Sequence, residues 1–510
     1  MNFDGSSFLA ISVVLAPLLI MALWTFSWRW AAAKLVMGLA FAAAALYFAQ
    51  AMIIGVPASQ LAWFHFNPLV SIMLLLISFI AWIVLRYAAT NFAQDVNGKR
   101  FLWWFNCTVF AVLCVVTSQN LVLLWLAWVA ISLSFHQLLM FYPTRPRAVL
   151  AAHKKFILAR IAESCLAVAF FLLWREHGSL NLDEIFSHYP VNSLSVQEQL
   201  AATLIALVAL IKCAQLPVHG WLIQVVESPT PVSALLHAGV INLGGFLLIL
   251  FSPLFSQSQF AQGFVIVVAG MSMLVAALVM MTRISIKVRL AWSTNAQMGL
   301  MLVECALGLY ELALLHMLAH SCYKAFAFLN SGEAVTEFLR AQHSAKRLPT
   351  MRSWIVAALV MLPSIALLVS FSGASIVPLS PWLILAAALT VFLTQLSAVG
   401  GRQQIVYALC WCLLLLGSYW AFKTMLAPVI PEHEHTYSGL FDVWMLSLFG
   451  ILLLGYFQLR YRPESTSSHR LFIALNAGFY LDEWLTRLTL KLWPLPRTLN
   501  TTATISHGAI

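Results

Sequence analysis

The first residue of this chain with the potential for chemistry is a lysine in the middle of an apolar run. Lys212 follows the segment LAATLIALVALI, has no acidic residue among its immediate neighbours, and precedes Pro217 by five positions. A lysine at the centre of a bilayer costs roughly 2.5–3.5 kcal/mol, so it usually faces a protein interior or a water path. Because burial favours the neutral form of a lysine, we expect Lys212 to exchange protons near neutral pH.

Candidate partners of Lys212 are Arg160 and Glu163, and Glu227 is a further candidate for the proton relay. Arg160 and Glu163 stand one helical turn apart in FILARIAESCLAV, and Glu227 begins the segment ESPTPVSALLH. A carboxylate near a lysine favours the charged form, so its withdrawal releases the proton. The alternative for Arg160 and Glu163 is an ion pair at the end of a helix.

Histidines in two further apolar segments extend the set of titratable groups. His237 lies six residues after Pro231, and His316, His320 and Lys324 follow one another at four-residue spacing. That spacing places the last three on one helix face, where they can form a line of groups that titrate near neutral pH. The alternatives are an interhelical hydrogen bond for His237 and a polar packing seam for the line.

Other patterns point away from metal, cofactor and covalent chemistry. The run EHEH at 432–435 falls in a predicted loop, the eight cysteines are scattered, and His65 and His136 are expected to be isolated and structural. No P-loop, GxGxxG, HExxH or GxSxG motif is present. We therefore expect neither a cofactor nor a metal in this chain, and no enzymatic activity of its own.

Composition shows which elements position these residues. The chain has 510 residues, 62% of them hydrophobic and only 9% charged, with a mean hydropathy of +0.89. Apolar runs long enough to cross a bilayer as helices recur throughout, which predicts an all-α polytopic membrane protein with about 14–15 transmembrane helices. The predicted spans are 6–26, 33–56, 66–86, 101–117, 120–142, 154–174, 200–226, 231–252, 260–281, 289–309, 311–338, 353–373, 381–399, 404–422 and 441–459.

Basic residues occur in alternate loops, which predicts the orientation. They include Arg145, Arg147, Lys154 and Lys155 in one loop and Arg340 to Arg352 in another, whereas the loops between are nearly free of them or acidic. The positive-inside rule places the N-terminus in the periplasm and the C-terminus in the cytoplasm of a bacterial inner membrane. The net charge of +10 therefore reflects topology and not nucleic-acid binding. The N-terminal segment is expected to be a retained helix and not a signal peptide.

Two prolines and the C-terminal segment add detail. Pro217 is predicted to break its helix near Lys212, and Pro363 is a candidate for a second, symmetry-related break. The stretch from Leu471 to Arg497 mixes aromatics with Asp482, Glu483, Arg487 and Lys491, which is typical of an interfacial amphipathic helix. It serves either as a cytoplasmic anchor or as a docking site for a partner.

Three sequence blocks together resemble the antiporter-like proton-translocating membrane subunits of complex I, Mrp-type cation/proton antiporters and membrane-bound hydrogenases. The blocks are KCAQLPVHGWL with ESPTPVSALLHAG, IKVRLAWSTNAQMG, and HMLAHSCYKAFAFLNSG, and NAGFYLDEWL resembles the C-terminal element of the large subunits. The resemblance covers roughly 119–340 and 476–485. It implies two inverted five-helix repeats with broken helices, with Lys212 central and His237, His316, His320 and Lys324 linking two half-channels.

On this resemblance the chain divides into five parts. They are N-terminal transmembrane helices at 1–118, a first repeat with Lys212 at 119–255, a second repeat with His316, His320 and Lys324 at 256–400, further transmembrane helices at 401–460, and a cytoplasmic amphipathic tail at 461–510.

Departures from the family pattern narrow the resemblance. Val129 follows Trp128 where energy-converting members carry a glutamate, Ser285 replaces an acidic residue, and FSGASIVPL at 371–379 lacks the second lysine. The chain also ends soon after Asp482 and Glu483, without the long lateral helix of large complex I subunits. This combination resembles the DabB-type subunits of the DAB inorganic-carbon accumulation complexes.

Membership of that branch implies a specific function and partner. The membrane subunit would pair with a large cytoplasmic, zinc-containing, carbonic-anhydrase-like protein of the DabA type, and proton flow would drive hydration of CO2 to bicarbonate. The alternatives are a pumping or antiporter subunit of a complex I-, hydrogenase- or Mrp-type complex, and a scaffold that only holds a partner at the membrane.

Overall fold

Long apolar helices make up most of the described chain. The computed structural model describes residues 5–23, 29–55, 63–92, 94–189, 193–333, 336, 339, 348–372, 379–397, 402–426, 429–430 and 439–494. Within these residues, eleven helices are long and apolar enough to cross a membrane. Apolar segments in a bilayer must satisfy their own backbone hydrogen bonds, which is why they form helices. The all-α polytopic architecture is confirmed.

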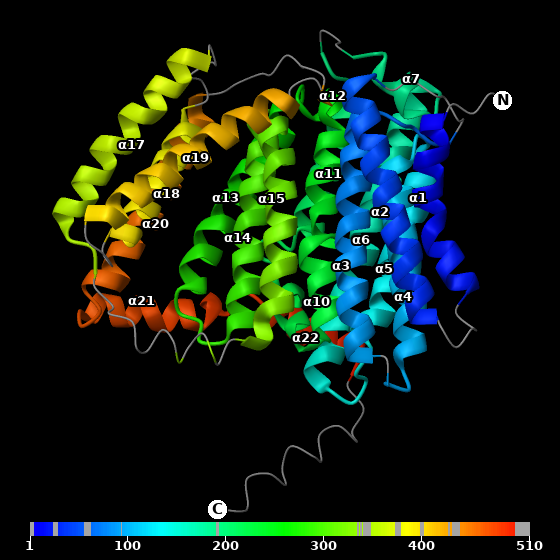
Figure 1. Cartoon of the computed structure of the whole chain (residues 1–510), viewed down its shortest axis with the longest axis horizontal. Coiled ribbons are helices and arrows are strands. Elements are labelled where there is room, and N and C mark those ends of the chain that lie inside the picture. The colour runs from blue at the N-terminus through cyan, green and yellow to red at the C-terminus, as the bar shows by residue number, and fades with distance from the viewer. Residues whose placement is uncertain are drawn as a thin grey trace, which may run out of the picture.

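Most helices stand side by side with their axes roughly parallel (Figure 1). Each predicted span overlaps a helix, and the spans 200–226 and 231–252 each overlap more than one helix, with an interruption between them. The bounds are α1 (Gly5–Ala22), α2 (Arg29–Ile53), α3 (Pro68–Phe92), α4 (Gly98–Thr117), α5 (Leu121–Leu139), α6 (Pro146–His177), α7 (Leu182–Phe186), α8 (Val196–Lys212), α9 (Gly220–Gln224), α10 (Thr230–Ala238), α11 (Leu243–Leu250), α12 (Ser252–Phe255), α13 (Gln259–Met280), α14 (Ile286–Ala306), α15 (Tyr310–Leu329), α17 (Met351–Ser372), α18 (Ser380–Ser397), α19 (Arg402–Leu426) and α20 (Gly439–Tyr461).

The predicted break near Pro217 is confirmed. A capping box of Ser195 and Glu198 starts α8, which ends at Lys212. The chain is then unwound until α9 begins at Gly220, and a short 3-10 turn follows at Val225–Glu227. Lys212 therefore lies at the C-terminal end of a helix, where the carbonyl dipoles favour a cation.

The other predicted break, at Pro363, is wrong. α17 runs through Pro363 as one helix of 22 residues. The hydroxyl of Ser364 donates to the carbonyl of Val360 at 2.7 Å. Side-chain bonds of this kind help a membrane helix to tolerate a proline. The segment with the missing second lysine, 373–378, lies outside the described residues, as does the EHEH run.

A further correction concerns α6. The predicted span began at residue 154, but α6 begins at Pro146, because proline is favourable in the first helical turn. Lys154 and Lys155 consequently lie inside the helix, at 0% and 6% exposure, and not in a basic surface loop. The other predicted basic loop, 340–352, lies mostly outside the described residues.

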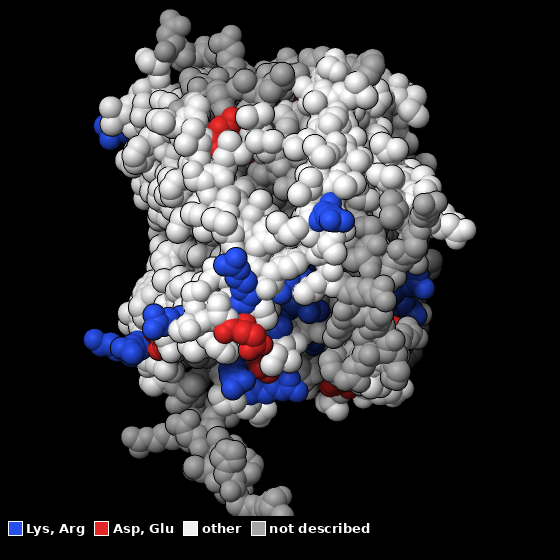
Figure 2. Space-filling model, turned by 90° about the vertical axis from the view of Figure 1, so that its left-hand side faces the viewer, with Lys and Arg blue, Asp and Glu red and all other residues white. Residues whose placement is uncertain are grey.

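The C-terminal segment is a helical strap across one end of the bundle. It consists of α21 (Thr466–Asn476), a 3-10 turn (Gly478–Tyr480) and α22 (Glu483–Leu492), and it crosses the lower ends of the upright helices (Figure 1). Leu475 and Leu485 on its inner side are buried, and α22 packs against α6. Lysine and arginine side chains gather on the same lower half of the face in Figure 2.

Candidate functional site

Lys212 lines a small buried cavity at the end of α8. The cavity has a volume of about 30 Å³, and its polar lining comes from Ser132, Lys155, Glu163 and Lys212. A water molecule needs roughly 10–15 Å³ of such space, so there is room for one or two. The ammonium of Lys212 lies 4.8 Å from the ring centre of Trp128, where the aromatic face favours a cation.

Glu163 is the acidic group of this cavity and is held by two partners. Its carboxylate pairs with the guanidinium of Arg160 at 2.7 Å and accepts a hydrogen bond from the hydroxyl of Ser132. The Glu163 side chain is 5% exposed and that of Arg160 is 35% exposed. α6 continues well beyond both residues in each direction, so the pair sits within the helix and not at its end. The expected neighbourhood of Lys212, Arg160 and Glu163 is present.

Lys155 is a member of this cluster that the sequence analysis missed. Its ammonium donates to the carbonyl of Ser132 at 2.8 Å and lies 5.6 Å from the ring centre of Phe135. Lys155 and Glu163 are eight residues apart on one helix, which places them on the same face. That spacing was visible in the sequence, but Lys154 and Lys155 together resembled part of a basic surface loop.

Polar side chains stabilise the unwound segment that follows Lys212. The amide of Asn295 donates to the carbonyl of Ala214 at 2.5 Å, and that of Gln215 donates to the carbonyl of Cys213 at 2.8 Å. The hydroxyl of Ser272 accepts from the amide of Leu216 at 2.9 Å. Backbone groups freed by the break are thus satisfied by α13 and α14, which is required for irregular backbone at membrane depth.

His237 lies in a second irregular segment. α10 ends at Ala238, and α11 resumes at Leu243 after a 3-10 turn. Nδ1 of His237 is 3.0 Å from the hydroxyl of Thr294, and its ring stacks on Phe328 at 4.3 Å. Among the described residues its Nε2 is buried with no hydrogen-bond partner. The hydrogen bond expected between helices is therefore made, and one ring nitrogen remains free for exchange.

The line of His316, His320 and Lys324 lies along α15, with His320 and Lys324 buried and the side chain of His316 12% exposed. Nδ1 of His316 is 2.9 Å from the carboxylate of Glu304, an acid on α14 that the sequence analysis overlooked. The rings of His316 and His320 are 6.2 Å apart. Lys324 is fully buried and donates to the carbonyl of Leu290 at 2.9 Å. The three residues lie in one row, but no hydrogen bond joins His320 to Lys324 within the described chain.

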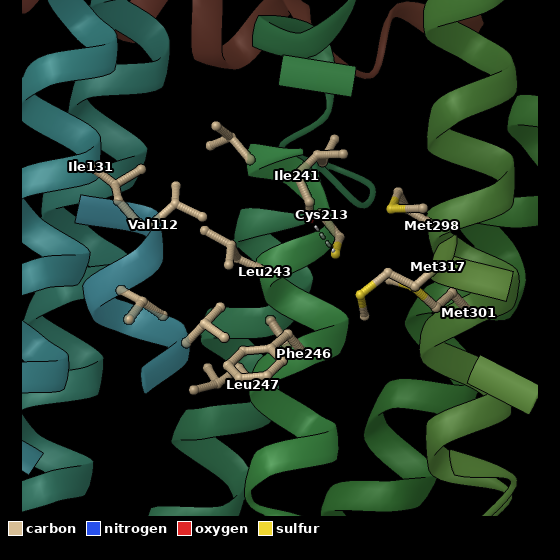
Figure 3. Close-up of a cluster of buried hydrophobic side chains, with 14 of the residues drawn as sticks. Val112, Ile131, Cys213, Ile241, Leu243, Phe246, Leu247, Met298, Met301 and Met317 are labelled. Carbon is tan, nitrogen blue, oxygen red and sulfur yellow. Dashed lines mark hydrogen bonds between the residues drawn. The ribbon is translucent and has the colours of Figure 1, made fainter. Parts of the chain in front are cut away.

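Apolar side chains from several helices pack together around Cys213 (Figure 3). Cys213, which follows Lys212, donates from its thiol to the carbonyl of Ile241 at 3.4 Å. On the α14 and α15 side the packing contains Met298, Met301 and Met317, the last of which follows His316.

Glu227 does not join either cluster. It lies in the 3-10 turn after α9, and its carboxylate is 3.7 Å from the guanidinium of Arg147 with 37% of its side chain exposed. Its backbone carbonyl accepts from Arg145 at 3.3 Å. Glu227 therefore lies apart from Lys212 in this conformation, with its side chain partly exposed, and its role in a proton relay stays a prediction.

Two histidines expected to be isolated have neighbours. Nδ1 of His65 is 3.4 Å from the carboxylate of Asp183, and the ring of His136 lies 6.2 Å from that of His153. Within the described residues, no group of three or more His, Cys, Asp or Glu side chains could hold a metal ion.

The geometry combines a broken helix, a buried lysine and carboxylate, and a separate row of titratable groups. Residues 118–346 match the family model described as NADH:quinone oxidoreductase/Mrp antiporter, TM. The chain is 46% identical over 437 residues, 85% of its length and 84% of the relative's, to the probable inorganic carbon transporter subunit DabB of Hydrogenovibrio crunogenus. The chain belongs to the DabB family of antiporter-like membrane subunits.

Other relatives of this DabB-family chain include a second DabB-type subunit and a subunit of NADH-quinone oxidoreductase. It is 36% identical over 444 residues (84% of this chain and 80% of the relative) to the probable inorganic carbon transporter subunit DabB2 of Halothiobacillus neapolitanus. It is 33% identical over 282 residues (55% and 44%) to NADH-quinone oxidoreductase subunit L of Mycobacterium tuberculosis.

A solved structure supports the fold. The Mrp complex from Dietzia sp. DQ12-45-1b matches with a TM-score of 0.55 and 18% identity over 98% of this chain. The chain spans 59% of the length of that Mrp chain, and this likeness concerns the fold alone.

Proposed function

We propose that this chain conducts protons across a bacterial inner membrane and that their flow drives a cytoplasmic partner to hydrate CO2 to bicarbonate. The observation that carries the proposal is the cavity at the broken end of α8, where Lys212 and Glu163 face room for water. Relatives named as inorganic carbon transporter subunits supply the substrate class.

In this proposal Lys212 and Glu163 exchange the proton. The guanidinium of Arg160 competes with Lys212 for the Glu163 carboxylate, since it already holds that group at 2.7 Å. When Glu163 turns toward Arg160, Lys212 loses its counter-charge and releases its proton. When the carboxylate returns, the charged lysine is favoured again. His237, His316, His320 and Lys324 form the other part of the path.

The chemistry belongs to the partner. We propose a large zinc-containing, carbonic-anhydrase-like subunit of the DabA type, bound to the cytoplasmic side of this chain, which has its N-terminus in the periplasm and its C-terminus in the cytoplasm. The chain itself would hold no cofactor. Each proton that moves inward down a potential of 100 mV releases about 2.3 kcal/mol. One or a few protons thus suffice to bias a nearly reversible hydration.

In this proposal Lys154 and Asp482 do not contact the partner directly, because they pair with each other at 2.5 Å. Arg147 and Arg487 have largely exposed side chains and are candidates for the contact.

The test uses a bacterial strain without carbonic anhydrase that grows at ambient CO2 only when this chain and its partner are expressed. Lys212→Ala and Lys212→Arg are expected to abolish growth at normal membrane abundance, because arginine cannot release its proton. Lys34→Ala, which changes an exposed lysine of α2, is the matched control. Growth of the Lys212→Ala strain, or carbon uptake that persists with an uncoupler, would overturn the proposal.

A pumping or antiporter role is the second candidate, favoured by the likeness to subunit L of NADH-quinone oxidoreductase. The cavity favours downhill conduction over pumping. Val129, beside Trp128, stands where the energy-converting members of the family carry a glutamate. Glu163 is therefore the one acid that lines the cavity. Copurification with redox subunits in place of a zinc protein would select this candidate.

A further inference from the structure

A row of buried basic side chains leads from the Lys212 cavity toward the strap. Lys155 lines the cavity together with Glu163 and Lys212. Its ammonium bonds the carbonyl of Ser132 at 2.8 Å. Ser132 stands one turn before His136 on α5, so the ammonium is within a helical turn of that histidine.

The row continues from His136 to the edge of the protein. The rings of His136 and His153 are 6.2 Å apart and nearly parallel, at 23°. His153 stacks face to face on Trp493 at 3.9 Å and 9°. Trp493 directly follows α22 and is 42% exposed. The last histidine of the row is therefore stacked against an aromatic ring that directly follows the strap.

The two histidines have free ring nitrogens. His153 is 5% exposed. Nδ1 of His136 and Nδ1 of His153 are both buried without a hydrogen-bond partner among the described residues. A buried polar atom is normally satisfied by protein or by water. A water that bridges the two rings would satisfy both nitrogens.

Lys154, the neighbour of Lys155, is engaged elsewhere. Its ammonium bonds the carboxylate of Asp482 at 2.5 Å and the hydroxyl of Thr486 at 2.7 Å. It is thereby fixed to the strap and satisfied. Lys155 has a carbonyl as its hydrogen-bond partner, so its charge is not neutralised by an ion pair within the described chain.

We propose that Lys155, His136 and His153 form a proton-conducting branch between the Lys212 cavity and the face covered by the strap. This inference rests on the proposed function and adds the route on one side of Lys212. The sequence alternation of charge makes that face the cytoplasmic one, so the branch releases protons toward the partner.

Each transfer along the branch balances in charge and atoms. An N–H bond of the Lys155 ammonium breaks, and the proton passes through a bridging water to a ring nitrogen of His136. This leaves a neutral amine and an imidazolium. His136 then passes a proton to His153 in the same way, and His153 gives it to water beside Trp493. Lys155 is charged again by a proton from the cavity.

The test measures proton flux through the whole complex in liposomes. Flux is driven by a potassium diffusion potential and followed with a pH-sensitive dye. Glutamine and glutamate have the same shape, but only the carboxyl group of glutamate can carry a proton. His153→Gln is expected to reduce the initial flux about tenfold or more, because a positioned proton-transfer group typically contributes at least that. His153→Glu is expected to retain most of the flux.

Two further variants test whether the residues act in series. His136→Gln combined with His153→Gln should be no slower than the slower single variant, since residues in series do not add their losses. Lys155→Met should lower the flux similarly. His65→Gln is the matched control, because His65 lies outside the branch and pairs with Asp183. Membrane abundance and copurification of the partner exclude failure to fold.

Distinct outcomes overturn the branch and the proposed function. Equal fluxes for His153→Gln and His153→Glu would show that the histidine only packs against Trp493. Normal flux in His153→Gln together with none in Lys212→Ala would reject the branch and keep the proposed function. Normal flux in both variants, or none in the wild type, would reject both.

Discussion

Removal of the Asp482 carboxylate is expected to release the C-terminal strap. Lys154 is fully buried and Asp482 is 22% exposed, and the two are 328 positions apart in the sequence. Gln224 also donates to the same carboxylate oxygen at 3.4 Å. In Asp482→Ala the ammonium of Lys154 keeps the hydroxyl of Thr486 but loses its counter-charge.

The size of the effect follows from burial. Removing one partner of a buried ion pair typically costs about 3–5 kcal/mol, because the other charge remains uncompensated. Because Asp482 is partly exposed, we expect its removal to cost about 3 kcal/mol, the lower end of this range. Since every 1.4 kcal/mol is a factor of ten, the population with an undocked strap should rise about a hundredfold.

The rate of tryptic cleavage reports the population with an undocked strap. Arg487 and Lys491 lie within α22, and cleavage there requires the helix to open. When opening is fast relative to cleavage, the cleavage rate follows the open population. We therefore expect cleavage of the purified Asp482→Ala protein to be about a hundredfold faster than that of the wild type.

Two comparisons make the result decisive. Glu483→Gln changes the adjacent acid, whose contact with Arg487 is 3.9 Å long and exposed, so its effect should be within about 0.5 kcal/mol. Lys154→Met combined with Asp482→Leu replaces the pair with apolar groups and should restore slow cleavage, as is common for buried pairs. Wild-type cleavage rates in Asp482→Ala would refute the reasoning.

The remaining predictions concern packing, the histidine row and pH. Gly220→Ala should also release the strap, because the added Cβ would lie 1.7 Å from a carboxylate oxygen of Asp482. Fast tryptic cleavage of this variant is expected. Gly417→Ala is the control and should be cleaved as slowly as the wild type, because the space around Gly417 is open. His316→Gln, His320→Gln and Lys324→Met should each reduce proton flux, and a double variant should be no worse than its worse single; additive losses would indicate separate packing roles. The hydrogen bond from His65 lowers the pKa of Asp183, so the contact stabilises the fold above the ordinary aspartate pKa of about 3.9 and loses this effect as the pH falls through the lowered value. The melting temperature of Asp183→Asn should thus lie below that of the wild type at pH 7 and converge with it in acid; a constant difference would contradict the assignment.

The sequence alone determined the helices and the two main clusters. A bilayer leaves an apolar segment few alternatives to a helix, so the predicted spans overlap helices of the structure. The break after Lys212 was visible because Pro217 follows a charged residue in an apolar run. The row of His316, His320 and Lys324 was visible because helical periodicity alone places the three on one face.

The tertiary structure decided which groups meet. Pro363 alone did not reveal that α17 continues, because a proline in a membrane helix can be tolerated through side-chain hydrogen bonds such as that of Ser364 to the carbonyl of Val360. Lys155 looked like part of a basic loop until packing of α6 against α5 and α8 buried it beside Glu163. The pairs of His316 with Glu304 and of Lys154 with Asp482 join different helices, and the second bridges most of the chain length. Such contacts are chosen by the mutual orientation of packed helices, because a buried charge requires a partner and the sequence does not state which acid lies within reach.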